Sequence, residues 1–370
     1  MKNRLIALYL PQYHPVPEND AWWGKGFTEW TNVTKASPLY KGHYQPQLPA
    51  DLGFYDLRVP EVREEQAKLA TENGIYGFCY YHYWFNGRRI LERPFQEVFE
   101  SGKPDFPFML CWANENWTRR WDGLEKEVLL QQNYSDEDDV QHMEYLVQYF
   151  KDPRYIRVNN KPVFILYKHF LLPDATATAK KWREIAAKYG LELYLCHMVF
   201  DYNPKGNRLV EGFDAAIDFE PFGVRRIHEE KNDYSVVDRI AKKVITKLVL
   251  SANRQKRELS KLPIRDYRYM YENLVPLKDI GYKIYPSLVP GWDNTARRQK
   301  NPILILDNSS PDNFREWLLK ITWDFKPYSA EENFIFINAW NEWAEGNHLE
   351  PCSKWGSQYL ETVKTVFNTQ

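Results

Sequence analysis

The sequence predicts a (β/α)8 barrel, the TIM barrel, as a single catalytic domain over residues 1–370. Two observations predict it: eight short apolar segments with the character of strands, and helical patterns that alternate with them over most of the chain. An open doubly wound sheet is the alternative, since it also alternates strands with helices. The segments expected as strands are 5–10, 75–81, 106–112, 163–167, 193–197, 214–219, 284–288 and 334–337.

Start and stop signals predict helices over 58–73, 94–101, 135–150 and 178–189. The first and the last of these end at a glycine, Gly74 and Gly190. The third begins with Ser135 as its N-cap, and an acidic first turn follows it.

An irregular stretch, residues 229–281, separates the sixth expected strand from the seventh. We interpret it as an insertion in one βα connection, because it contains two helical patterns. A solvated helix face explains its charge more simply than a partner-binding patch. Its basic tract consists of Arg254, Lys256, Arg257, Lys261 and Arg265.

The charge balance argues against a polyanionic partner. Lys and Arg total 49 against 50 for Asp and Glu, which leaves no electrostatic surplus for nucleic acid or an acidic membrane surface. No segment approaches the roughly 20 apolar residues that cross a bilayer. The apolar run at residues 5–10 is too short for a signal peptide, so the chain as given is expected to be cytoplasmic. The sequence leaves the oligomeric state open.

The aromatic content is high, with 14 Trp, 25 Tyr and 20 Phe. Large flat rings beyond the needs of a core often line a pocket for a ligand with apolar faces and polar edges, and sugars are such ligands. An aromatic-rich core explains the composition equally well.

Polar and aromatic residues gather just after the expected strands and not before them. Active sites of barrel enzymes lie at this C-terminal rim, where the chain leaves each strand. We therefore expect an oligo- or polysaccharide substrate to be bound there. The candidate ligands are Tyr13, His14, Tyr81, His82, Trp84, Trp112, Asn114, Glu115, Trp117, His197, Glu220, Trp292, Asp293, Asn338, Trp340, Asn341, Trp343 and His348.

Two glutamates after the eighth strand, Glu342 and Glu345, are the candidate catalytic pair. Glycosidic cleavage generally needs a protonated acid for the leaving oxygen and an ionised carboxylate. In a turn both could face one cavity, and the neighbouring tryptophans could exclude water and raise the pKa of the acid. A solvated loop edge or a capping interaction is the alternative. Glu115 and Glu220 are weaker candidates, because each could simply pair with a basic side chain.

No cofactor or metal is expected. The histidines lack metal-ligand spacing and are better explained as hydrogen-bonding residues of a polar pocket. A phosphate-binding loop, a dinucleotide-binding fingerprint and a serine nucleophile elbow are all absent from the sequence.

Five motifs, spread in order along nearly the whole chain, resemble the WbsX-like proteins, a family similar to glycoside hydrolase family 99. The first runs from YLPQYH at 9–14 through PEND and WWG to GFTEW at 26–30. The others are GFCYYHYWF at 77–85, CWANENW at 111–117, GWDN at 291–294 and NAWNEWAEG at 338–346.

This resemblance implies a (β/α)8 fold and endo-acting α-mannosidase or α-mannanase chemistry. The E-W-x-E pattern that follows the last strand in family 99 matches Glu342 and Glu345. By that likeness Glu345 is the general acid and base at the leaving oxygen. Glu342 deprotonates the sugar 2-hydroxyl, which gives a 1,2-anhydro intermediate and net retention without a metal.

Three functions are therefore considered. The first is a retaining glycoside hydrolase acting within an α-mannoside-like or related surface polysaccharide. The second is a glycosyltransferase of O-antigen or capsular polysaccharide (lipopolysaccharide) biosynthesis, as WbsX-like proteins are often labelled, although the sequence lacks a convincing D-x-D motif. The third is a non-catalytic carbohydrate-binding protein.

Overall fold

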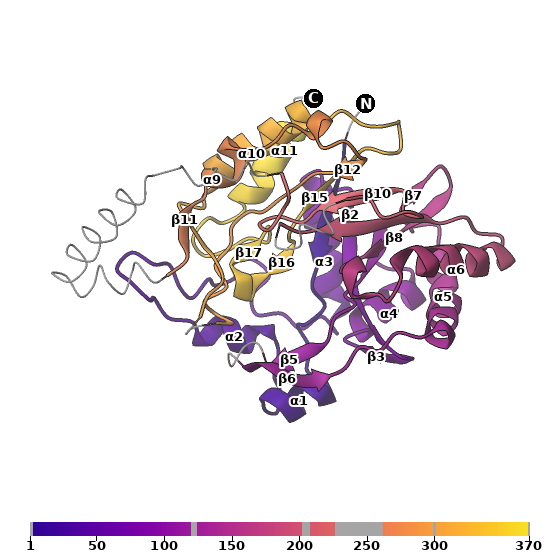
Figure 1. The fold of residues 1–370 in the computed structure, drawn as a ribbon. Coiled ribbons are helices and arrows are strands. Elements are labelled where there is room, and N and C mark those ends of the chain that lie inside the picture. Colours follow the sequence, from indigo (N-terminus) through magenta and orange to yellow (C-terminus); the bar gives the residue numbers. More distant parts are fainter. Residues whose placement is uncertain (1–2, 120–123, 202–207, 226–261, 299–300, 369–370) are drawn as a thin grey trace, which may run out of the picture.

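A closed parallel barrel forms the centre of the computed structural model, which describes residues 3–119, 124–201, 208–225, 262–298 and 301–368 (Figure 1). Each predicted strand segment is confirmed, and all neighbouring barrel strands are parallel. In chain order the strands are β1 (Arg4–Tyr9), β2 (Gly77–Phe85), β4 (Phe108–Trp112), β8 (Lys161–Leu166), β9 (Tyr194–Val199), β10 (Ala215–Asp218), β12 (Ile284–Tyr285), β13 (Ser287–Leu288) and β15 (Phe334–Ile337).

The seventh strand closes the barrel in two pieces. β12 pairs with β10 and β13 pairs with β15, and only Pro286 stands between them. The carbonyl of Pro286 accepts a hydrogen bond from the N–H of Phe336 at 2.9 Å, so the proline keeps its place in the ladder. The first strand pairs with the last, with Ala7 opposite Ile337. The barrel prediction is confirmed and the open doubly wound sheet is excluded.

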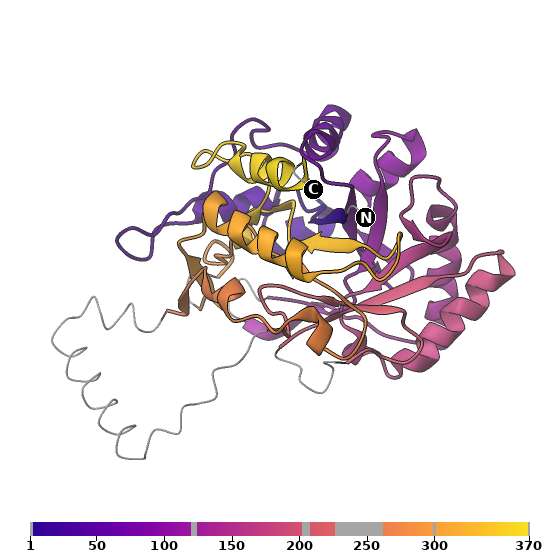
Figure 2. The same cartoon turned by 90° about the horizontal axis from the view of Figure 1, so that it is seen from above.

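Helices cover much of the outside of the barrel, and Figure 2 shows the molecule from above. The four predicted helices are confirmed within a few residues, and the side chain of Ser135 accepts from the N–H of Asp138 as expected of an N-cap. Two further helices, not predicted, pack against each other near the chain's end. The six are α3 (Pro60–Glu72), α4 (Arg93–Ser101), α5 (Asp136–Phe150), α6 (Ala175–Lys188), α10 (Pro311–Asp324) and α11 (Gln358–Asn368).

The barrel strands are buried almost throughout, as expected for parallel strands covered on both faces. Many of the aromatic residues pack in this core, so an aromatic core accounts for part of the composition. Five tryptophans are completely or almost completely buried: Trp112, Trp182, Trp317, Trp340 and Trp343.

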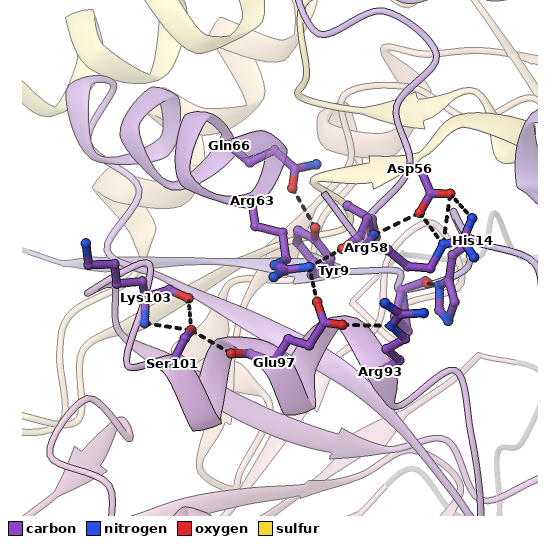
Figure 3. Close-up of polar contacts among 12 residues, drawn as sticks. Tyr9, His14, Asp56, Arg58, Arg63, Gln66, Arg93, Glu97, Ser101 and Lys103 are labelled. Carbon is purple, nitrogen blue, oxygen red and sulfur yellow. Dashed lines mark hydrogen bonds and ion pairs between the residues drawn. The ribbon is translucent and has the colours of Figure 1, made fainter. Parts of the chain in front are cut away.

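A polar network outside the barrel joins α3 to α4 and to β1 (Figure 3). Arg63 of α3 is buried and forms an ion pair of 2.8 Å with Glu97 of α4, which also pairs with Arg93 at 2.7 Å. Tyr9 of β1 donates to Gln66 of α3 at 2.6 Å. These contacts fix the helices that support the first two strands.

The insertion 229–281 is described only in part, because residues 226–261 lie outside the described ranges. Its basic tract other than Arg265 falls there, so the prediction of two helical patterns in the insertion is tested only over residues 262–281. The described remainder is not one continuous helix but holds β11 (Ile264–Asp266), α9 (Tyr269–Glu272) and the 3-10 turn η4 (Leu277–Asp279). β11 pairs in parallel with β14 (Ile305–Asp307).

Several short elements lie outside the barrel strands. They are α1 (Pro17–Trp23), α2 (Glu29–Lys35), β3 (Arg88–Ile90), the hairpin of β5 (Trp117–Arg119) and β6 (Leu124–Leu130), β7 (Arg157–Val158), η2 (His169–Leu171), β16 (Asn341–Glu342), η5 (Trp343–Glu345) and β17 (Asn347–His348). None of the described helices combines the length and the apolar character that crossing a membrane would require.

Candidate active site

A cleft of ≈ 550 Å³ opens at the C-terminal rim of the barrel. Segments that follow most of the barrel strands contribute to its wall, as expected for an active site on this fold. Its lining includes Leu10, Gln12, Tyr81, Tyr83, Glu115, Asn116, Trp117, Tyr167, Lys168, Phe219, Phe222, Trp292, Asn294, Arg297, Asn338, Glu342 and Glu345.

The chain turns sharply after β15 and brings Glu342 and Glu345 to the same cleft. Glu342 ends β16, residues 343–345 form the 3-10 turn η5, and Gly346 follows with φ of +59°. A Cβ at Gly346 would come within 2.5 Å of the Gln47 amide, so glycine suits both the conformation and the space. The turn therefore gives the two carboxylates one shared direction, which a continued strand would not.

Arg297 binds the two glutamates and a third carboxylate, Glu29, at the same time. Its Nη2 lies 2.6 Å from Oε2 of Glu342, and its Nη1 lies 2.6 Å from Oε1 of Glu345. Nη2 also lies 2.6 Å from Oε1 of Glu29, the fully buried first residue of α2. The side chains of Glu342 and Glu345 are 8% and 21% exposed, so solvent screens this cluster weakly.

Burial raises the pKa of Glu345 to about 8, with Arg297 lowering it and Glu342 raising it further. Burial likewise raises the pKa of Glu29 to about 7 against the lowering effect of Arg297. Although burial lowers the pKa of Arg297, the three carboxylates hold it well above its ordinary value. Burial of this kind favours the protonated form of Glu345 beside the Arg297 guanidinium.

A buried carboxylate, Glu350, stabilises the turn at residues 343–345 through hydrogen bonds. It accepts hydrogen bonds from Trp343 at 2.6 Å, from Tyr55 at 2.7 Å and from Gln66 at 2.6 Å. Burial raises its pKa to about 7. Because Trp343 stands between the two glutamates in the chain, this network fixes the turn that presents them.

Hydrogen bonds connect the turn that carries Glu342 and Glu345 to the residues that follow β1. The side chain of Asn341 accepts from the N–H of Leu10 at 2.8 Å and donates to its carbonyl at 3.0 Å. The hydroxyl of Tyr13 donates to the carbonyl of Asn341. Tyr13, Asn341 and Trp343, predicted as substrate ligands, are thus placed to support the cleft wall.

The far wall carries an ion pair between Glu115 and Lys168 at 2.5 Å. Asn114 fixes the lysine's backbone, since its amide accepts from Lys168 N–H at 2.7 Å and donates to its carbonyl at 2.9 Å. The ends of β4 and β8 are thereby joined. This pair offers a carboxylate and an ammonium to a polar ligand in the cleft.

Seven of the residues singled out from the sequence line the cleft: the pair Glu342 and Glu345, and with them Tyr81, Glu115, Trp117, Trp292 and Asn338. The sequence reasoning missed Glu29, Tyr83, Lys168 and Arg297. Tyr83 follows from Tyr81 by the two-residue period of a strand. Glu29 lies in the GFTEW motif and Arg297 lies just beyond GWDN, so both stand in or next to segments already recognised.

The alternation of β2 corrects two predicted ligands. Tyr81 and Tyr83 line the cleft, whereas His82 and Trp84 point to the opposite face of the strand. There His82 contacts His142 of α5, with 2.9 Å between their Nε2 atoms, and Trp84 donates to Asp138 at 2.8 Å.

The remaining predicted ligands also lie away from the cleft lining. Trp112 donates to the carbonyl of Trp84, His14 contacts the carbonyl of Pro11, and Trp340 packs on Phe78. His197 accepts from the N–H of Val210, and Glu220 accepts from that of Gly223. Asp293 and His348 line a second cavity.

Burial keeps the predicted histidines neutral. It lowers the pKa of His82, His197 and His348 to about 3 each, and that of His14 to about 4. Over the described ranges, no three His, Cys, Asp or Glu side chains are grouped as metal ligands.

Comparison with solved structures finds proteins of the same barrel fold. One such neighbour is a "Glycoside hydrolase-like protein", with a TM-score of 0.60 and 15% identity, covering 99% of this chain and 94% of the other. Another is the GH99 endo-alpha-mannosidase from Bacteroides thetaiotaomicron, with a TM-score of 0.55, 15% identity, and coverage of 99% and 97%. Its complex with BIS-TRIS-propane gives a TM-score of 0.53 at 14% identity, with the same coverage.

The chain belongs to the WbsX family. The family described as Glycosyltransferase WbsX matches residues 5–363. WxcX, an uncharacterized protein of Xanthomonas campestris pv. campestris, is 40% identical over 362 residues, which are 97% of this chain and 49% of that protein. Its counterpart in strain B100 is 39% identical over the same length. The chain thus spans about half the length of these relatives.

Proposed function

We propose that this protein is a retaining glycoside hydrolase that cleaves α-mannoside-like or related linkages within a surface polysaccharide. The observation that carries the proposal is the carboxylate pair: Glu342 and Glu345 line one cleft, share one guanidinium, and differ in environment. A pKa of about 8 leaves Glu345 protonated at neutral pH, which suits a general acid. Endo action and the α-mannoside preference rest on the likeness to family 99.

In the proposed reaction, Glu342 removes the proton of the sugar 2-hydroxyl. Oxygen O2 then bonds to C1 as the C1–O bond to the leaving group breaks, and Glu345 gives its proton to the leaving oxygen. The 1,2-anhydro sugar is opened by water at C1, with Glu345 taking a proton from the water and Glu342 returning its proton to O2. Two inversions at C1 give net retention.

Arg297 has a defined part in this scheme. By pairing with Glu342 it keeps a cation beside the base, and its second nitrogen orients Glu345. The lining rings of Tyr81, Trp117 and Trp292 offer apolar faces to the sugar, while Asn338 and the Glu115–Lys168 pair offer polar edges.

The test compares leaving groups. Glu345→Gln should slow poor leaving groups by about 10²- to 10⁴-fold and activated aryl glycosides far less, since these need little protonation. Glu342→Gln should slow both. Glu361→Gln, a change on the exposed face of α11, is the matched control.

A 2-deoxy substrate tests the role of Glu342 separately. It should be almost inert with the native enzyme, because the reacting 2-hydroxyl is missing. Normal turnover of the 2-deoxy substrate, or a glycosyl ester trapped on Glu342, would establish ordinary double displacement instead.

The family description favours a second candidate, a glycosyltransferase of O-antigen or capsular polysaccharide assembly. Incubation with labelled nucleotide sugars separates the two, since the hydrolase predicts no donor binding. A non-catalytic carbohydrate-binding protein would bind glycan equally well before and after Glu345→Gln, with no turnover in either form.

A further inference from the structure

A second cavity of ≈ 550 Å³ lies beside the cleft, and no step of the proposed reaction uses it. It is formed by segments after β13, β14 and β17 together with the loop at residues 40–47. Its lining includes Tyr40, His43, Tyr44, Gln47, Arg268, Trp292, Asp293, Asp307, Asn308, Ser309, Asn313, His348, Lys354 and Trp355.

One thin wall separates the two cavities. Trp292 lines both of them, and the N–H of Asp293 donates to the carbonyl of Glu345 at 2.6 Å. A Cβ at Gly291 would come within 2.9 Å of the Gly346 carbonyl, so the two chain segments are in close contact. The second cavity therefore lies directly behind the peptide that carries the proposed acid.

Hydrogen bonds make this wall rigid. The carboxylate of Asp293 accepts from Gln45 at 2.7 Å and from the hydroxyl of Thr295 at 2.6 Å. His43 Nδ1 accepts from the N–H of Leu39 at 3.0 Å, so its Nε2 carries the proton that it donates to Asp293 at 2.7 Å. Because Asp293 is thus satisfied within the protein, it does not require a cation from a ligand.

Two partly exposed aromatic rings, Tyr44 and Trp355, belong to the lining of this cavity. The Lys354 ammonium lies 4.8 Å from the ring centre of Tyr44 and 4.9 Å from that of Trp355, so one cation contacts both rings. Tyr44 is 37% exposed and Trp355 is half-buried, so both rings keep surface for a ligand. A preformed pair of aromatic faces is a suitable platform for sugar rings.

The polar part of the lining fits a neutral polyol. The amide of Gln47 and the oxygen atoms of the Asn308 and Ser309 side chains lie in the lining as polar groups for a ligand. The amide nitrogens of Asn308 and Asn313 already donate to Asp266 and to the Asn308 carbonyl, each at 2.9 Å. Both signs of charge occur in the wall, and Arg268 is paired with Asp266 at 2.9 Å. An anionic or cationic ligand would therefore find no excess of opposite charge.

We propose that this cavity is a distal carbohydrate subsite, which binds a neutral sugar unit of the same glycan whose scissile bond lies in the cleft. The inference rests on the proposed glycan-directed function, and it makes the preferred substrate a polymer long enough to cross the wall at Trp292. A disaccharide reaches only the cleft.

The experiment measures binding by the Glu345→Gln protein, which does not consume its ligand. The probes are a disaccharide and an octasaccharide from yeast α-mannan, and matched fragments of a rhamnose-containing O-antigen, titrated by calorimetry. Adding Trp355→Ala or Tyr44→Ala should weaken octasaccharide binding about tenfold and leave disaccharide binding unchanged. Trp355→Phe should restore most of the affinity. Trp323→Ala, which removes a tryptophan that is 78% exposed elsewhere, is the matched control.

Equal octasaccharide affinity with and without Trp355 and Tyr44 would overturn the subsite, as would an absence of octasaccharide binding by the parent. Failure of the hydrolase proposal looks different. In that case the native protein releases no reducing ends, while the length-dependent loss in the Trp355 and Tyr44 variants persists. Retained melting temperatures in both variants confirm that the folded protein was tested.

Discussion

Replacing Arg297 with methionine removes the only guanidinium that contacts all three carboxylates of the cluster in the described cleft. Methionine keeps an unbranched chain of similar reach and takes away the charge. Glu29, Glu342 and Glu345 then face one another without a cation, so they can no longer all ionise together at neutral pH. We expect the pKa of Glu345 to rise above its native value of about 8.

The magnitude follows from the contact distances. Each Nη–Oε separation is 2.6 Å, which puts the centres of charge on the order of 4 Å apart. At an effective dielectric constant of about 20, that interaction is about 4 kcal/mol, or about 3 pH units in pKa. The side chain of Glu345 is 21% exposed, so solvent reduces the effect. We expect the pKa of Glu345 to rise by more than about 1 pH unit in Arg297→Met.

The assay is the pH dependence of kcat/KM for a glycoside with a poor leaving group, whose cleavage requires the proton of Glu345. In Arg297→Met the alkaline limb should move upward, because Glu345 keeps its proton longer. The rate at pH 7 should fall by about 10²-fold, because a proton shared within the cluster disables Glu342 as a base. Arg297→Lys should be intermediate, since one ammonium cannot contact three carboxylates with the same geometry. An unchanged alkaline limb in Arg297→Met would refute this account of the cluster.

Three further predictions follow from the same contacts. The folded protein holds the Glu345 proton to about pH 8, whereas the unfolded chain releases it near 4.5. The unfolding free energy should therefore fall as pH rises between these values. Thermal melts of Glu345→Gln should show a flatter dependence of stability on pH. Glu350→Ala leaves the buried indole N–H of Trp343 without an acceptor, and chemical denaturation should show a loss of about 3 kcal/mol together with a lower kcat. Lys168→Met removes the partner of Glu115, and steady-state kinetics should show a raised KM with kcat nearly unchanged, whereas an equal loss in both would place Lys168 in the chemical step.

The barrel was predictable because its strands leave a local signal. Parallel strands covered on both faces are apolar throughout, and β8 and β9 are buried along almost their whole length. Pro286 within the segment 284–288 does mark an interruption in the sequence, because a proline cannot donate to the ladder, but the pairing that divides the segment into β12 and β13 is visible only in the structure. Helices α10 and α11 were missed although Ser310 caps the first of them, with its side chain accepting from Asn313 N–H.

The site was predictable where its residues are neighbours in sequence. Glu342 and Glu345 follow one expected strand and stand next to tryptophans, and this local placement indicated a pair. Arg297 and Glu29 meet across 268 positions, and no local pattern reports such a contact. On β2, in contrast, the sequence did carry the necessary signal. The two-residue period of a strand places Tyr83 on the same face as Tyr81, and it places His82 and Trp84 on the opposite face.

The most direct test of the central claim is the release of reducing ends from α-linked mannan, rhamnan and O-antigen fragments, without any nucleotide sugar present. The account predicts that the native protein releases fragments whose new anomeric centre first appears with retained configuration, and that Glu342→Gln and Glu345→Gln release almost none. No fragment released from any of these glycans, together with incorporation of label in a parallel incubation to which a labelled nucleotide sugar is added, would contradict it.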